Sequence, residues 1–90
     1  MKRYGVYETG KYLATLENPK RPEFVLIEQI NKCQAWVVRD VANGVVCLQS
    51  YNTIVSVKQG DEGVSLGHWS VTTSKHQSFF RRWCSRNAGV

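Results

Sequence analysis

The sequence lacks the features that mark several common classes of protein. Its apolar runs are all far shorter than the ~20 residues of a membrane-spanning helix, and its first residues, MKRYGVYETGKY, contain no hydrophobic signal segment. We therefore expect a cytoplasmic protein without membrane contacts. The cysteines Cys33, Cys47 and Cys84 are odd in number and widely spaced. This pattern argues against a disulfide framework and predicts reduced, mostly buried thiols.

Motifs for metal binding, nucleotide binding and nucleophilic catalysis are also missing. No two cysteines are closely spaced, and His68 and His76 do not have the spacing of two ligands on one helix turn. The segment SVTTSK, residues 70–75, has no glycine ahead of its lysine, so it does not fit a phosphate-binding loop. Cys84 follows His76 by eight residues. On a helix this separation is ~12 Å, too far for a nucleophile and its base. We expect no enzymatic activity, no cofactor and no metal.

Acidic side chains are unevenly distributed along the chain, which has a net charge of +5. Residues 1–22 carry five cations and two carboxylates, whereas residues 23–62 have a negative balance. Residues 63–90 contain no carboxylate side chain and four cations: Lys75, Arg81, Arg82 and Arg86. If the two ends meet in space, they form one basic face suited to phosphate. Ordinary solubilising charge is the alternative interpretation.

The 90 residues predict a single domain, 1–90, with one modest core. Residues 3–17 are predicted to form a hairpin that turns at Thr9-Gly10, with Tyr12, Ala14 and Leu16 alternating along its second arm. The segment NPKRP, residues 18–22, contains two prolines and predicts a loop. We expect Lys20 and Arg21 to form an exposed basic tip there.

Residues 23–58 are dense in β-branched and aromatic residues and predict a meander of strands. Asn31-Lys32 and Asn43-Gly44 indicate two-residue turns, and the second suits a type I′ turn. Residues 45–58 are too many for one straight strand, so the interruption at residues 50–52 suggests a bend or bulge. Gly60 and Gly63 then lead into a short strand at residues 64–69.

Two-residue turns would place Trp36 opposite both Ile27 and Tyr51. One face of the meander is then apolar (Phe24, Leu26, Ile30, Cys33, Ala35, Val37, Val46 and Leu48). The other face is apolar too (Val25, Ile27, Trp36, Val38, Cys47 and Tyr51). A sheet with one wet face would show alternation instead. The second face must therefore be covered by the helix, by curling of the sheet or by another chain, and a homodimer through this face is one prediction.

The pattern changes after residue 69. Four positions recur at the spacing i, i+3, i+4 and i+7 of one helical stripe: His76, Phe79, Phe80 and Trp83. They predict a helix over about residues 73–86, with Thr72 or Thr73 as its N-cap. A helix start that carries these hydroxyls and Lys75 is also able to hold a single phosphate, which is a second interpretation.

Together these elements predict an α+β fold. We expect an antiparallel sheet of five to six strands, strongly curved or partly closed, packed by one C-terminal amphipathic helix. The core is predicted to contain seven side chains: Phe24, Leu26, Val37, Leu48, Ile54, Phe79 and Trp83.

Residues 46–80 carry a further pattern. LQSYNTIVSVK is followed, after a hairpin, by HWSVTTSKHQSFF. This stretch resembles a group of small phage, plasmid and mobile-element proteins with the pattern Leu-x-Ser-Tyr-x-Thr-x-Val, then an aromatic residue and Ser-x-Thr-Thr-Ser-Lys/Arg-His. The matching positions are Leu48, Ser50, Tyr51, Thr53, Val55, Trp69, Ser70, Thr72, Thr73, Ser74, Lys75 and His76. The resemblance implies a mobile-element origin and a shared hairpin-plus-helix core, and it implies no activity.

Two functional hypotheses follow. The first is a module that binds nucleic acid or a nucleoprotein complex through the basic face formed by the two ends, because cations contact phosphates and aromatic rings stack on bases. Its candidate binding residues are Lys20, Arg21, Lys75, Arg81, Arg82 and Arg86. The second is a phage-encoded inhibitor of a host antiviral defence system, anti-CRISPR-like, that docks on a host protein. This second hypothesis depends on the resemblance and on the small size of the chain.

Overall fold

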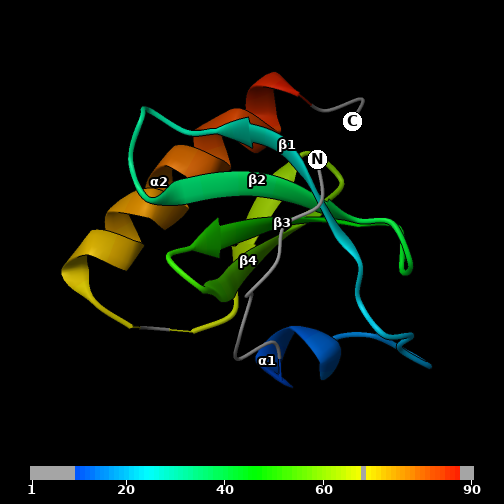
Figure 1. Cartoon of the computed structure of the whole chain (residues 1–90). Coiled ribbons are helices and arrows are strands. Elements are labelled where there is room, and N and C mark those ends of the chain that lie inside the picture. The colour runs from blue at the N-terminus through cyan, green and yellow to red at the C-terminus, as the bar shows by residue number, and fades with distance from the viewer. Residues whose placement is uncertain (1–9, 68, 88–90) are drawn as a thin grey trace.

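The computed structural model describes residues 10–67 and 69–87 (Figure 1). Its elements follow in the order α1 (Gly10–Leu13), β1 (Phe24–Gln29), β2 (Ala35–Asp40), β3 (Val45–Ser50), β4 (Thr53–Gln59), β5 (Glu62–Ser65) and α2 (Val71–Arg86). The strands form one antiparallel sheet in the order β1-β2-β3-β4-β5. The predicted α+β fold is confirmed, with five strands in an open sheet. Neither described helix is long and apolar enough to cross a membrane.

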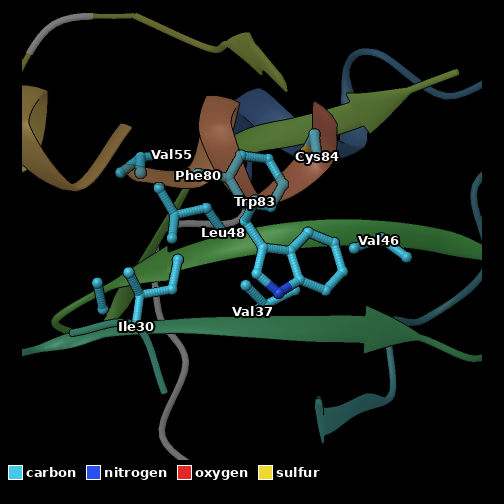
Figure 2. Close-up of a cluster of buried hydrophobic side chains, with 9 residues drawn as sticks. Ile30, Val37, Val46, Leu48, Val55, Phe80, Trp83 and Cys84 are labelled. Carbon is cyan, nitrogen blue, oxygen red and sulfur yellow. The ribbon is translucent and has the colours of Figure 1, made fainter. Parts of the chain in front are cut away.

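Helix α2 covers one face of the sheet (Figure 1). Ser70 is its N-cap, and the Ser70 Oγ accepts a hydrogen bond from the Thr73 N–H at 3.1 Å. Phe80 and Trp83 project from α2 toward the strands, and their rings stack at 6.2 Å (Figure 2). They belong to a first core of Ile30, Ala35, Val37, Val46, Leu48, Val55, Phe80, Trp83 and Cys84. Burial of each large apolar side chain contributes about 1.5–3 kcal/mol.

The opposite face is covered by α1 and the residues that follow it (Figure 1). Tyr12 is fully buried and donates its phenolic O–H to Asp40 Oδ2 at 2.5 Å. A second core surrounds it: Tyr12, Phe24, Val38, Cys47, Ile54 and Val57. The chain's own N-terminal segment therefore covers the second apolar face. A homodimer through this face stays a prediction, although no second chain is needed to bury these side chains.

The predicted second arm of the N-terminal hairpin is wrong. The first arm lies outside the described residues, and the second is the helical turn α1, followed by further turns. The Thr15 N–H donates to the Tyr12 carbonyl at 2.9 Å, and the Leu16 N–H donates to the Leu13 carbonyl at 3.1 Å. Tyr12, Leu13 and Leu16 therefore pack on the sheet while Ala14 is exposed. That is the spacing of a helical turn, and strand alternation would have buried Ala14.

The turn between β2 and β3 is longer than predicted. Four residues connect the strands in place of two, so Trp36 lies opposite Gln49 and not Tyr51. The wider turn forms around the buried carboxylate of Asp40, whose Oδ1 accepts the backbone N–H of Ala42 at 3.1 Å. Because the shift is two residues, each side chain keeps its predicted face of the sheet.

The pairing of β1 with β2 also differs from the prediction. Gln29 lies opposite Trp36, the position predicted for Ile27. The pairing then shifts back by one residue at a bulge in the middle of β1, so the first half of the strand is one residue out of the predicted register. A one-residue shift exchanges the two faces of a strand. Phe24 therefore belongs to the second core, although the sequence placed it on the same face as Val37.

Residues 50–52, predicted as a bend or bulge, reverse the chain completely. Ser50 pairs with Thr53, so Tyr51 and Asn52 form a two-residue turn between β3 and β4, with Tyr51 at a φ of 54°. The strand predicted at residues 64–69 is β5, which runs from Glu62 to Ser65.

Helix α2 begins two residues before the predicted start, and the N-cap is Ser70, so the predicted caps Thr72 and Thr73 are wrong. Thr73 is instead a buried residue of the first turn. Of the predicted core, five side chains are buried: Phe24, Val37, Leu48, Ile54 and Trp83. Leu26 and Phe79 are half-buried.

Candidate functional site

The outer side of α2 carries a stripe of cations. Arg82 and Arg86 follow Lys75 by seven and eleven residues. At 3.6 residues per turn, all three lie within about 20° of one line along the helix, over a length of ~16 Å. The three side chains are exposed, and α2 contains no carboxylate among its 16 residues. We call Lys75, Arg82 and Arg86 the outer stripe.

Arg81, the fourth predicted cation of the helix, lies on the side of α2 that faces β5. It donates to the Ser78 Oγ at 3.0 Å. Its stem passes close to Gly63 of β5, where a Cβ would lie 3.3 Å from the Arg81 Cγ. One carboxylate does reach α2, from the opposite side: Glu28 of β1 accepts the indole N–H of Trp83. The outer stripe therefore holds three of the four cations of the helix, and Arg81 lies apart from it on the β5 side.

Lys20 and Arg21 are exposed in the segment before β1, as predicted, but they lie apart from the start of α2. The Lys20 N–H donates to Asn43 Oδ1 at 2.8 Å, and Asn43 Nδ2 donates to the Lys20 carbonyl at 3.0 Å. This contact holds Lys20 at the β2–β3 turn. In an antiparallel meander that turn lies at the opposite end of the sheet from the β3–β4 turn, where α2 starts.

The N-terminal region nevertheless reaches the start of α2 through another cation. Lys11 of α1 places its Nζ 4.7 Å from the centre of the Trp69 ring, in the segment that leads into α2. A cation over an indole face is attracted by the ring electrons. Lys11 thus brings one cation of the N-terminal region to the segment before α2, while Lys2 and Arg3 lie outside the described residues.

A buried cluster of hydrogen bonds joins the β3–β4 turn to the first turns of α2. The Ser50 Oγ lies 2.8 Å from His76 Nδ1 and 3.1 Å from the Thr73 Oγ1. The Tyr51 ring lies over His76, with the ring centres 5.7 Å apart. Burial lowers the pKa of His76 below 6.5, and the charge of Lys75 lowers it further. The imidazole is therefore neutral at pH 7.

Ser50 and His76 have the spacing of a nucleophile and its base, but their surroundings do not suit catalysis. Ser50 is only 2% exposed and His76 only 3%, so a substrate has no access to the hydroxyl. The Ser50 Oγ also contacts Thr73, which is part of the helix start. The cluster therefore fixes the position of α2 on the sheet, and enzymatic activity is not indicated by it.

Gln77 fixes the same helix turns on the other side. Its Nε2 lies 3.0 Å from the Val55 carbonyl, 3.0 Å from the Ser65 Oγ and 3.3 Å from the Gly67 carbonyl. The start of α2 is thus attached to β3 through Ser50 and to the β4–β5 side through Gln77. These bonds hold the outer stripe in a fixed orientation relative to the sheet.

The cysteines do not form a reactive site. Cys47 and Cys84 are buried and all three thiols are unpaired. Burial raises the pKa of Cys84 to about 11 and raises the pKa of Cys47 as well, so both are protonated at neutral pH. Across residues 10–67 and 69–87, no three His, Cys, Asp or Glu side chains are placed to hold a metal ion. His68 lies outside the described residues.

The sequence interpretation missed the relation of Ser50 and Tyr51 to the helix. Both belong to the quoted pattern, together with Thr73 and His76, and the four residues meet in the structure. Because all four residues belong to one sequence pattern, the pattern was the signal from which their proximity could have been predicted. Pairing them across 26 residues required the hairpin turn, which the sequence interpretation read as a bend.

These features define a small α+β protein in which a helix with a cationic outer side is fixed on an antiparallel meander. The chain belongs to a family described as Family of unknown function (DUF8033), whose pattern matches residues 13–88. No curated protein and no solved structure matches the chain significantly.

Proposed function

We propose that the protein binds nucleic acid through the outer stripe of α2. The observation that carries the proposal is the charge of this helix, which has four cations and no carboxylate, with three of the cations on one exposed line. Phosphate backbones are recognised by such rows of Lys and Arg, and binding releases the counterions that surround the nucleic acid.

The rigid attachment of α2 supports the same proposal. The contacts of Ser50 and Gln77 orient the helix so that Phe80 and Trp83 face the sheet and the outer stripe faces solvent. The stripe extends over ~16 Å, a length that lets three cations contact successive phosphates of one backbone. Lys20 and Arg21, at the β2–β3 turn, are expected to contribute little.

The test is a salt titration of binding to a labelled oligonucleotide. We expect the affinity of the wild-type protein to fall steeply as salt rises. The double variant Arg82→Glu, Arg86→Glu should bind at least ~10-fold more weakly, and its slope of log K against log salt should be shallower by about 1.8 on duplex, since each lost phosphate contact removes about 0.9.

A matched control separates this contact from the effect of net charge. The double variant Lys20→Glu, Arg21→Glu changes the net charge by the same amount at two exposed positions outside α2, in the segment before β1. We expect its salt slope to equal that of the wild type. Equal losses in both double variants would show only non-specific attraction, and unchanged binding in the helix variant would refute the proposal.

The alternative hypothesis, a phage-encoded inhibitor that docks on a host defence protein, stays a prediction that depends on the resemblance, as does the mobile-element origin. It gains weight if the purified protein shows no salt-sensitive binding to nucleic acid and retains one host polypeptide after nuclease treatment.

A further inference from the structure

Three segments meet at the end of the sheet where α2 starts: the β1–β2 loop, the β3–β4 turn and the first turns of the helix (Figure 1). The Tyr51 N–H donates to the Gln34 carbonyl at 2.9 Å, which joins the turn to the loop. The Ser50 hydroxyl contacts His76 at 2.8 Å, which joins the turn to α2. Apart from Tyr51 and Val71, the exposed side chains of this surface are polar or cationic. They are Asn31, Lys32, Gln34, Asn52, Thr72 and Lys75.

The backbone of this surface is held in an uncommon conformation. Asn31, Lys32 and Tyr51 have φ values of 48°, 54° and 54°. The left-handed region is unfavourable for side chains larger than Asn or Asp. A tyrosine at such a turn position is notable because glycine or asparagine would fit the same backbone without strain.

Tyr51 is the exposed aromatic side chain of this surface, 48% exposed. One side of its ring rests on His76, at a ring-centre distance of 5.7 Å and a tilt of 43°, so the ring is supported from below. His76 in turn is fixed by Ser50. The result is an aromatic ring that contacts a fixed, buried side chain while about half of the residue stays exposed to solvent.

Each of the two segments that contact the Tyr51 turn carries an exposed cation. Lys75 precedes His76 on α2 and begins the outer stripe, and Lys32 belongs to the β1–β2 loop that is bonded to the turn. A supported aromatic ring beside a row of cations is the arrangement by which proteins bind single-stranded nucleic acids, since unpaired bases stack on the ring while cations follow the backbone.

We propose that the protein binds single-stranded nucleic acid, with one unpaired base stacked on Tyr51. The adjoining phosphates are held by Lys32 and by the outer stripe, which begins at Lys75. The inference rests on the proposed function and names its substrate class. A duplex offers no base face to Tyr51, so it contacts the cations alone. Binding is tolerant of sequence because every base has a face that stacks.

The test compares a labelled single strand with a duplex of the same sequence. The key variant is Tyr51→Asn, which removes the ring and leaves a residue that accepts the left-handed turn. We expect its single-strand affinity to fall about 5- to 150-fold, the range of one base stack, while its duplex affinity stays within about 2-fold of wild type. Tyr51→Phe retains the ring and should bind the single strand as wild type does.

A purely structural role for Tyr51, as a cover for His76, predicts something different. In that case Tyr51→Asn lowers the melting temperature and leaves single-strand binding per folded molecule unchanged, which would overturn the inference. If the variant does not fold, the ring can be followed in the wild-type protein. Its proton resonances should move upfield when the single strand is added and stay in place when the duplex is added.

The failure of this inference can be told apart from failure of the proposed function. Equal or tighter binding to the duplex, with loss in the Arg82→Glu, Arg86→Glu variant, would refute stacking on Tyr51 and keep the helix as a nucleic-acid contact. Binding of neither nucleic acid by the wild-type protein would refute both.

Discussion

The two faces of the sheet are covered in different ways. One face is covered by the 16-residue helix α2, whose Phe80 and Trp83 fill the first core. The other is covered by the four-residue helix α1 and the turns after it, with Tyr12 as its fully buried centre. The long helix is attached over a wide apolar area, whereas the short one depends on a phenol bonded to a buried carboxylate.

The two faces also differ in the charges that they offer to a binding partner. The carboxylate of Asp40 is fully buried and satisfied by Tyr12, by the side chain of Asn43 and by backbone N–H groups, so it offers no charge to a partner. On the α2 side the polar groups between helix and sheet are satisfied too, but the helix presents its cations outward. The buried charge of Asp40 therefore serves the fold, whereas the exposed charges of the fixed helix are available for binding.

The largest effect is expected from Trp83→Ala. Trp83 is 4% exposed and stacks on Phe80 in the first core, so its truncation leaves a cavity and should cost about 3–5 kcal/mol of the free energy of unfolding. Urea unfolding measures the loss. The control Phe79→Ala, at the half-buried edge of the same helix, should cost clearly less. An unchanged melting temperature in Trp83→Ala would mean that α2 packs by another side.

An intermediate effect distinguishes the two faces by pH. His76, with a pKa held below 6.5 by burial and by Lys75, protonates more readily in the unfolded chain, so the α2 side should lose stability as the pH falls below about 6.5. Burial raises the pKa of Asp40, but hydrogen bonds from Tyr12 and Asn43 outweigh it and hold the pKa below 3.8. The contribution of Asp40 is therefore present above pH 3.8 and should be lost as the pH falls through its folded pKa.

Unfolding by urea at a series of pH values tests this separation with two variants. His76→Gln should show a shallower loss below pH 6.5 than the wild type. Asp40→Asn should be about 1–3 kcal/mol less stable at neutral pH, because the Tyr12 and Asn43 donors lose their charged acceptor, and it should lack the acid loss below pH 3.8. If the free energies of unfolding of His76→Gln and wild type fall in parallel from pH 7 to 5, the loss of stability below pH 6.5 does not come from His76.

The smallest effect concerns the start of α2. Ser70→Ala removes the side-chain acceptor of the Thr73 N–H and should cost about 0.5–2 kcal/mol, measured by thermal unfolding. Thr72→Ala is the matched control, because Thr72 is exposed and lies one residue inside the helix. We expect Thr72→Ala to change the stability by less than about 0.5 kcal/mol. The reverse order of the two losses would restore Thr72 as the cap.

The architecture was predictable where a pattern repeats. The spacing of Phe80 and Trp83 predicted α2, and the continuous apolar strands predicted a sheet that needs cover on both faces, which the structure confirms. A repeating pattern is averaged over many residues, so one misplaced turn does not erase it. The two-residue shift at the β2–β3 turn left the side chains of β2 and β3 on their predicted faces for this reason.

The remaining features depend on single long-range contacts, which local patterns do not encode. Tyr12 alternates with Ala14 and Leu16 as a strand would, but it lies in the helical turn α1, where its phenol bonds to Asp40, 28 residues away. The bulge in β1 moved Phe24 to the other core in the same way. In the candidate site, the cations of α2 were visible in the sequence, whereas the support of Tyr51 by His76 arises only after the β3–β4 hairpin closes.

The bulge in β1 and the brevity of β5 have a consequence for self-association. In the described part of the chain these two strands are the edges of the open sheet, and edges with free backbone groups invite pairing with other molecules. A bulge interrupts the regular ladder on one edge, and four residues offer little length on the other. Both devices discourage fibril-like growth by strand addition, so we expect the protein to stay dispersed at high concentration and to meet its partners through side chains.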